Sequence, residues 1–220
     1  MKTKTSIFRL FVDASMTVLL ILLMSYQVTG EAFHEWVGIS MTVILVVHHI
    51  LNIKWYSVLF KGKYNAYRVI TTVVNTLLLA SIVLTALGGM SMSNFAVPFM
   101  NGIIDLIFAK TTHLALSFWS FILMGLHLGL HLPAMTAKIK PDKTLRIILT
   151  TVFALIAVFG LFLFFKNRIY RYISFSTHFA AFDYDKALVL VFIENLAVMF
   201  FFVFAGANTV RLIKSTKKGS

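Results

Sequence analysis

The stretch HEWVGISMTVILVVHHILNIKW, residues 34–55, decides the class of this fold. Between its first histidine and its pair of histidines it is almost entirely apolar, and a helix needs about 20 such residues to cross a bilayer. Comparable apolar runs recur along the chain and predict spans over residues 8–29, 34–53, 68–88, 112–132, 145–165 and 187–208. We therefore expect an all-α integral membrane protein, in which residues 1–220 form one six-helix transmembrane bundle.

The composition supports this class. Hydrophobic residues make up 59% of the 220 residues and charged residues only 13%, whereas a soluble domain carries about 25% charged residues. An ordinary soluble enzyme, a disordered chain and a coiled coil are therefore excluded. Cysteine is absent, which excludes disulfides, cysteine-held zinc, iron–sulfur clusters held by this chain and covalently attached c-type haem.

The net charge of +12 follows from the arrangement of the basic residues. With the N-terminus inside, 15 of the 20 Lys and Arg residues fall on the inner side of the membrane. This positive-inside bias predicts a multi-pass protein of the cytoplasmic (inner) membrane with both termini cytoplasmic. Topology and anionic membrane lipids account for the basic charge, so a nucleic-acid partner is not expected.

Histidines are concentrated in two of the spans. Six of the seven lie in or at the ends of the second and fourth spans: His34, His48, His49, His113, His127 and His131. Ionisable residues inside a span are costly and usually mark function. His48 follows His34 by 14 residues, and His127 follows His113 by 14 residues. Fourteen steps end within about 40° of four full turns, so each pair shares one face of its helix.

The second and fourth spans run parallel because one span separates them. His34 then lies at the depth of His113, near the outer surface, and His48 at the depth of His127, toward the inner side. The two depths are about 21 Å apart. A neutral imidazole from each helix can bind the iron of a planar cofactor, so the pattern predicts two noncovalent b-type haems in a core around these helices. No catalytic residue is predicted.

Two neighbouring histidines remain alternatives at the inner depth. His49 lies about 60° past the face of the outer histidine of its helix, whereas His131 returns to the face of its own outer partner. Pairing His48 with His131 would mismatch the ligand depths by about 6 Å. We therefore prefer His48 and His127. His131 is then expected to contact a haem propionate or a quinone, or to extend toward the inner interface.

Other residues near the histidines are candidate cofactor contacts. Gly38, Gly125 and Gly129 would let a macrocycle or a neighbouring helix approach the backbone. Asn52 lies one turn after His48 on the same face. Near the outer haem, the candidate supporting residues are Glu31, Glu35 and Trp36.

A quinol donor would require protonatable groups near its binding site. The candidates are Asp13, Asp105, Glu194 and Asn195, and none of them belongs to a motif. Glu194 is the first to test because it lies inside the sixth span, where a charged side chain is costly and usually has a function. The outer connection 166–186, rich in aromatic residues and arginine, is a candidate docking surface for a soluble partner.

These residues resemble diheme cytochrome b membrane proteins of the ferric-reductase and cytochrome b type. Residues 34–55, together with TTHLALSFWSFILMGLHLGLH at 111–131, resemble more specifically the bacterial flavinylation-associated cytochromes. The resemblance covers two helices and the loops around them. It implies haem ligation by the four histidines of the two 14-residue pairs and electron transfer across the membrane. The chain has no flavin-attachment motif or nicotinamide fingerprint, so any flavin would sit on a partner protein.

The expected function is electron transfer between a quinol pool, or another donor on the cytoplasmic side, and an extracytoplasmic flavin or other redox partner. The chain would then be an electron-transfer subunit or a component of a quinol-dependent oxidoreductase. The rival hypothesis is a haem-free transporter of metal ions or protons that uses the intramembrane histidines. The haem content distinguishes the two hypotheses: the first predicts two haems per chain and the second predicts none.

Overall fold

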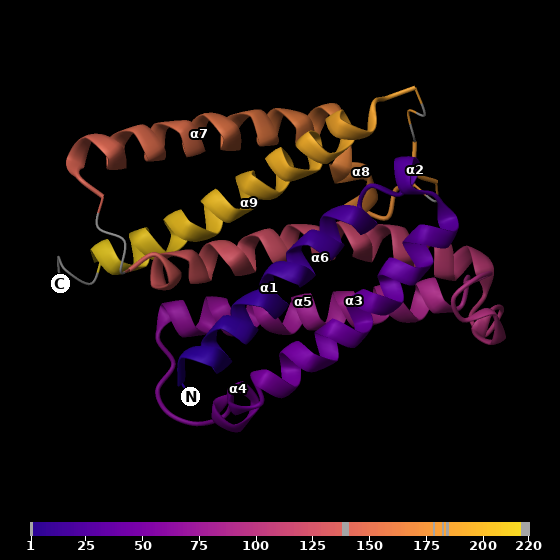
Figure 1. Ribbon diagram of the computed structural model, residues 1–220, viewed down its shortest axis with the longest axis horizontal. Helices are drawn as coiled ribbons and strands as arrows, with labels where there is room; N and C mark the ends of the chain where they lie inside the picture. The colour runs from indigo at the N-terminus through magenta and orange to yellow at the C-terminus, as the bar shows by residue number, and fades with distance from the viewer. Residues whose placement is uncertain (1, 138–140, 178, 182, 184, 217–220) are drawn as a thin grey trace. The chain divides into compact units, whose positions relative to one another are not determined.

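The computed structural model describes residues 2–137, 141–177, 179–181, 183 and 185–216, and these residues form helices and connections without a strand (Figure 1). The helices in chain order are α1 Lys2–Leu23, α2 Tyr26–Thr29, α3 Glu31–Leu51, α4 Lys54–Val58, α5 Ala66–Met90, the 3-10 helix η1 Pro98–Met100, α6 Leu106–Met135, α7 Lys143–Lys166, α8 Ile169–Ile173 and α9 Leu188–Thr216. The all-α prediction is confirmed.

Five helices in the described part of the chain are long and apolar enough to cross a membrane. They are Glu31–Leu51, Ala66–Met90, Leu106–Met135, Lys143–Lys166 and Leu188–Ser215. These helices match the second to sixth predicted spans in order. The first predicted span, 8–29, is divided between α1 and α2, and its crossing of the membrane stays a prediction.

The chain divides into two compact units. The first consists of Met1–Lys63, Val83–Leu114 and Thr177–Phe192, and the second of Tyr64–Ile82, Ala115–Ser176 and Ile193–Ser220. Helices α5 and α6 each contribute to both units. The division bears on function because His34, His48 and His113 belong to the first unit, whereas His127 and His131 belong to the second.

The first unit is built on α1 and α3, which pack along one another. Each helix buries apolar residues at four-residue intervals: Val12, Met16 and Leu20 on α1, and Val37, Met41 and Leu45 on α3. That interval keeps side chains on one helix face. The turn between the helices is made by Ser25, whose buried hydroxyl donates to the Ile21 carbonyl at 2.8 Å, and by Gly30 with φ +79°. Glycine adopts this left-handed conformation without strain.

The second unit is held together by glycines on its helices. A Cβ added at Gly125 would lie 2.7 Å from Cβ of Phe202, and one at Gly129 would meet the Val203 carbonyl on α9. Gly160 on α7 faces the Ala197 carbonyl, also on α9. Such small residues let helix backbones approach closely, which is the main source of helix association in membranes. Helix α9 is therefore seated on α6 and α7 through glycine contacts.

The outer connection between α5 and α6 is shorter than the predicted spans imply, whereas the one between α7 and α9 is not. Helix α6 begins at Leu106 because the Asp105 carboxylate accepts the backbone N–H of Phe108 at 2.9 Å, and α6 continues past Pro133 to Met135. Within this connection, Pro98 begins the short helix η1 and Gly102 has φ +83°. In the connection 166–186, α8 is packed into the second unit by its buried residues Ile169 and Tyr172.

Candidate functional site

His34 and His113 lie next to one another in the first unit. Their ring centroids are 6.0 Å apart and their planes make an angle of 73°. With a histidine–metal bond of about 2 Å and about 1 Å from that nitrogen to the ring centre, two imidazoles on opposite sides of one metal have centres about 6 Å apart. An ordinary edge-to-face ring contact covers the same range. The separation therefore fits bis-histidine ligation without requiring it.

The His113 ring is oriented by helix α5. Its Nδ1 lies 2.8 Å from the backbone carbonyl of Thr85. A carbonyl only accepts, so Nδ1 carries the proton and the neutral ring has its lone pair on Nε2. A Cβ added at Gly89 would lie 3.0 Å from Cε1 of the ring, and one at Gly88 would lie 3.4 Å from Cβ of His113. The two glycines therefore make the room that the ring occupies.

His34 has a different environment. Tyr26 of α2 packs edge-on against the ring with centroids 5.1 Å apart. Nδ1 is buried and makes no hydrogen bond, although the Leu23 backbone at the end of α1 lies close enough to interact with the ring. A buried ring nitrogen without a partner is unfavourable. Nδ1 would gain a partner if the His34 ring rotated slightly toward the Leu23 backbone or if a group bound beside it.

The acidic residues predicted near the outer histidines hold the loop after α5. The Glu35 carboxylate accepts from Ser93 Oγ at 2.7 Å and from the backbone N–H groups of Asn94, Phe95 and Ala96 at 2.8–2.9 Å. Glu31 accepts from the Asn94 amide at 2.8 Å. Glu35 therefore fastens this loop to the start of α3, beside His34, while Trp36 is exposed.

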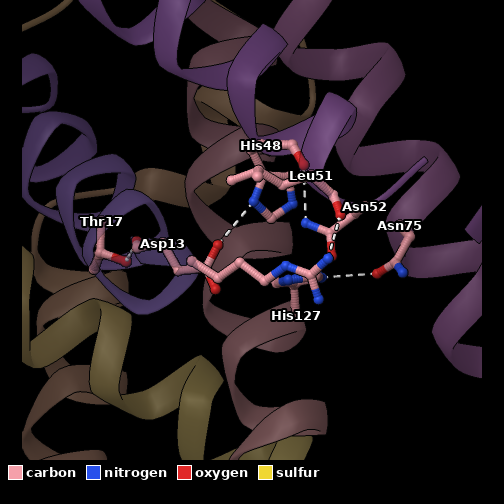
Figure 2. Close-up of polar contacts among 8 residues, drawn as sticks. Asp13, Thr17, His48, Leu51, Asn52, Asn75 and His127 are labelled. Carbon is pink, nitrogen blue, oxygen red and sulfur yellow. Dashed lines mark hydrogen bonds and ion pairs between the residues drawn. The ribbon is translucent and has the colours of Figure 1, made fainter. Parts of the chain in front are cut away.

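His48 has a carboxylate partner on α1. Its Nδ1 lies 2.8 Å from Oδ1 of Asp13, and Figure 2 shows this carboxylate directed at the ring. The carboxylate accepts, so Nδ1–H donates, and in the neutral ring the lone pair is on Nε2. His49, the alternative ligand, has its Nδ1 2.7 Å from the hydroxyl of Tyr56. Asn52 donates from Nδ2 to the His48 carbonyl at 2.9 Å and ends α3.

His127 lies in the second unit and is oriented by Asn75 on α5. Its Nδ1 is 2.8 Å from Oδ1 of the asparagine, so the ring again donates from Nδ1 (Figure 2). His131 packs against His127 with ring centroids 4.7 Å apart. Nearby, the Tyr67 hydroxyl donates to the Leu130 carbonyl, and Thr71 has a buried hydroxyl without a hydrogen bond. The polar side chains of α5 thus line this part of α6.

The structure brings together only some of the predicted site residues. His34 and His113 are in contact, whereas the pairing of His48 with His127 stays a prediction from spacing because the two belong to different units. The cofactor roles of Gly125 and Gly129 also stay predictions, and their contacts with α9 already account for both glycines. A Cβ added at Gly38 would meet only Leu23, at 3.9 Å, which leaves space beside α3.

Several partners of the histidines were not anticipated: Tyr26, Tyr56, Asn75, Thr85, Gly88 and Gly89. Asn75 could have been found as an amide inside the apolar run TTVVNTLLL at residues 71–79, and the two glycines as a doublet in a span. The sequence does not show which backbone carbonyl will accept a side-chain hydrogen bond, so the Thr85 contact could not be predicted. Asp13, one of the candidate quinol residues, contacts His48, and its quinol role stays a prediction.

Glu194 is the charged residue inside the last span. Its Oε2 accepts a hydrogen bond from Nδ2 of Asn167 at 2.9 Å, within the second unit. On α6, Trp119 donates to the Ile173 carbonyl and Phe118 stacks on Tyr172 with centroids 4.4 Å apart. His178, in the outer connection 166–186, lies outside the described residues.

Within the described residues there is no group of three or more His, Cys, Asp or Glu side chains placed to hold a metal ion. Scans against protein-family models, curated proteins and solved structures find no match to this chain.

Proposed function

We propose that this protein is a membrane cytochrome that carries electrons across the bilayer on two b-type haems, each held by two histidines. The main support is the outer pair, in which the His34 and His113 rings are 6.0 Å apart and His113 donates from Nδ1 to a backbone carbonyl. A histidine that binds a metal through one nitrogen almost always donates from the other to an acceptor, which fixes its tautomer.

The second haem is proposed on His48 and His127. The 14-residue spacing on each helix supports this choice, and so do the acceptors at Nδ1 of each ring, Asp13 and Asn75. Bound haem iron with two histidine ligands would supply one-electron redox chemistry. The protein residues would hold the rings in their orientation and keep the iron in an apolar medium.

The resemblance to the flavinylation-associated cytochromes supports the same proposal. We place the protein in the cytoplasmic membrane with both termini cytoplasmic and α1 as a sixth span, on the basis of the distribution of Lys and Arg. The donor would be a quinol pool or a cytoplasmic-side protein. The acceptor would be a flavin-bearing or other redox partner outside the membrane, docked at the connection 166–186.

The deciding experiment is the oxidised and reduced visible spectrum of detergent-purified protein, with the haem-to-protein ratio. We expect a low-spin b-type spectrum and two haems per chain. His34→Ala and His113→Ala should each remove the same haem, and His48→Ala and His127→Ala the other. His49→Ala is the matched control and should keep both. A protein that cannot be loaded with haem refutes the proposal and favours the transporter of metal ions or protons.

The quinol part of the proposal has a separate test at Glu194. Glu194 lies inside the apolar helix α9, and its carboxylate accepts a hydrogen bond from Asn167 at the end of α7. This carboxylate is a candidate proton acceptor for a bound quinol. Glu194→Gln should slow haem reduction by a quinol but leave reduction by dithionite unchanged. Asp142→Asn, at the start of α7, is the control because its carboxylate caps that helix and is not among the candidate quinol residues. Equal quinol rates in the wild type and Glu194→Gln would exclude this role.

A further inference from the structure

The candidate haem ligands of the first unit differ in what they meet at Nδ1. His48 donates to the carboxylate of Asp13 at 2.8 Å and His113 to the neutral backbone carbonyl of Thr85, whereas no described residue is hydrogen-bonded to Nδ1 of His34, which lies near the Leu23 backbone. Glu35 is next to His34 in sequence, but its carboxylate accepts from four donors of the loop after α5. A carboxylate therefore supports the ring at one end of α3 and no carboxylate is bonded to the ring at the other.

The contact between Asp13 and His48 is fixed by the packing of α1 on α3. Val12 and Met16, on either side of Asp13 in sequence, are buried, and α1 packs along α3. One turn earlier, Arg9 donates to the Leu51 carbonyl at 2.8 Å, in the last turn of α3. Two polar contacts, at Arg9 and Asp13, thus hold α1 at one register against the end of α3 that carries His48.

A carboxylate acceptor changes the imidazole as a ligand. The charge-assisted hydrogen bond draws the Nδ1 proton toward the carboxylate, which makes Nε2 more basic. A more basic ligand stabilises ferric iron relative to ferrous iron and so lowers the reduction potential. A neutral carbonyl acceptor lowers the reduction potential less than a carboxylate does, and a ring without an acceptor has the smallest effect.

We propose that Asp13 is a positioning residue for His48 and that it makes the haem bound at His48 the lower in potential of the two. This inference rests on the proposed function. Electrons would then run downhill along α3 from the His48 end to the His34 end, a helix rise of about 21 Å. With the topology proposed above, the direction is outward, from a cytoplasmic-side donor to an extracytoplasmic acceptor.

The test is a redox titration of the purified holoprotein, followed by haem absorbance. Asp13→Asn keeps the size of the side chain and an acceptor oxygen but removes the charge. It should raise the lower midpoint by the equivalent of about a tenfold change in the reduction equilibrium, or about 59 mV for one electron. The higher midpoint should not move, and Asp13→Glu should restore the wild-type value. Thr17→Val is the control, because the Thr17 hydroxyl donates to the Asp13 backbone carbonyl at 3.0 Å and not to its carboxylate.

A second measurement does not depend on any substitution at Asp13. His34→Ala removes a ligand of the other haem, so the haem that remains should titrate at the lower of the two wild-type midpoints. A remaining haem at the higher midpoint overturns the inference. So does a lower midpoint that is the same in Asp13→Asn and in the wild type.

The haem-free protein provides a readout of the contact itself. With ¹⁵N-labelled histidine, the His48 nitrogen shifts should show a protonated, hydrogen-bonded Nδ1, and Asp13→Leu should change them. Protein that holds two haems but fails the potential tests refutes this inference and leaves the proposed function standing. Protein that holds no haem refutes the proposed function, and the role of Asp13 in electron transfer with it.

Discussion

Substitution of Gly89 by alanine should disturb the outer histidine site in a way that the same change at Gly88 does not. Both glycines lie in the last turns of α5, so the gain in helix propensity, about 0.5–1 kcal/mol, is similar and cancels in the comparison. At Gly88 the new methyl group would lie 3.4 Å from the Ala109 carbonyl and from Cβ of His113, an ordinary contact. At Gly89 it would lie 3.0 Å from Cε1 and 3.2 Å from Nδ1 of His113.

The His113 ring cannot move aside without a penalty. Its Nδ1 is held by the Thr85 carbonyl at 2.8 Å, and loss of that bond from a buried ring costs about 1–3 kcal/mol. Overpacking that the ring absorbs in place costs a similar amount, about 1–3 kcal/mol. Gly89→Ala should therefore be about 2 kcal/mol less stable than Gly88→Ala by either route.

The assay is denaturant unfolding of the two haem-free variants in the same detergent, followed by haem titration of each. We expect Gly89→Ala to unfold at lower denaturant and to bind the haem of the His34 and His113 site about tenfold or more weakly, as for changes that misorient a metal ligand. Equal stability and equal haem affinity of the two variants would show that His113 does not pack against Gly89, and would refute the reasoning from this contact.

Three further outcomes follow from single contacts. Glu35→Ala removes the acceptor of four hydrogen bonds, so hydrogen exchange should accelerate at residues 93–97 and stay unchanged in α3 beyond its first turn; unchanged exchange in that loop would contradict the contact. Gly129→Leu should lower the unfolding temperature sharply, because its side chain would meet the α9 backbone, and Gly38→Leu should be much milder. Asp142→Ala should cost about 1 kcal/mol, since its carboxylate caps α7 through the N–H of Leu145 at 2.7 Å, with Asp142→Asn close to the wild type.

The positions of the long helices could be predicted from the sequence because apolar length alone determines which segments suit a membrane. The helix ends could not, since they depend on local hydrogen bonds. Asp105 starts α6 six residues before the predicted span, and the hydroxyl of Ser25 bonds back to the end of α1 inside the first predicted span. In the loop after α5, the residues bound by Glu35 have no periodic pattern, and their arrangement follows from one carboxylate on another helix.

The candidate site was predictable to the level of the histidines. Helical periodicity gives the shared face of each 14-residue pair, and chain order gives the parallel direction of the two helices. Neither gives the register of one helix against the next, which decides what each ring meets. Asp13 contacts His48 because α1 is held at one register by buried Val12 and Met16. In the second unit, the contact between Asn75 and His127 likewise depends on the register of α5 against α6.

The hydrogen bonds at Nδ1 also weigh on the choice between haem ligation and transport. A histidine that relays protons takes up a proton at one nitrogen and releases one from the other, so both nitrogens must exchange partners. A histidine that holds a metal uses one nitrogen and benefits from a fixed acceptor at the other. His113, His48 and His127 each meet an oxygen acceptor at 2.8 Å, from a backbone carbonyl, a carboxylate and an amide respectively. Three different acceptors that impose the same tautomer on three of the four predicted ligands favour rings held for ligation through Nε2.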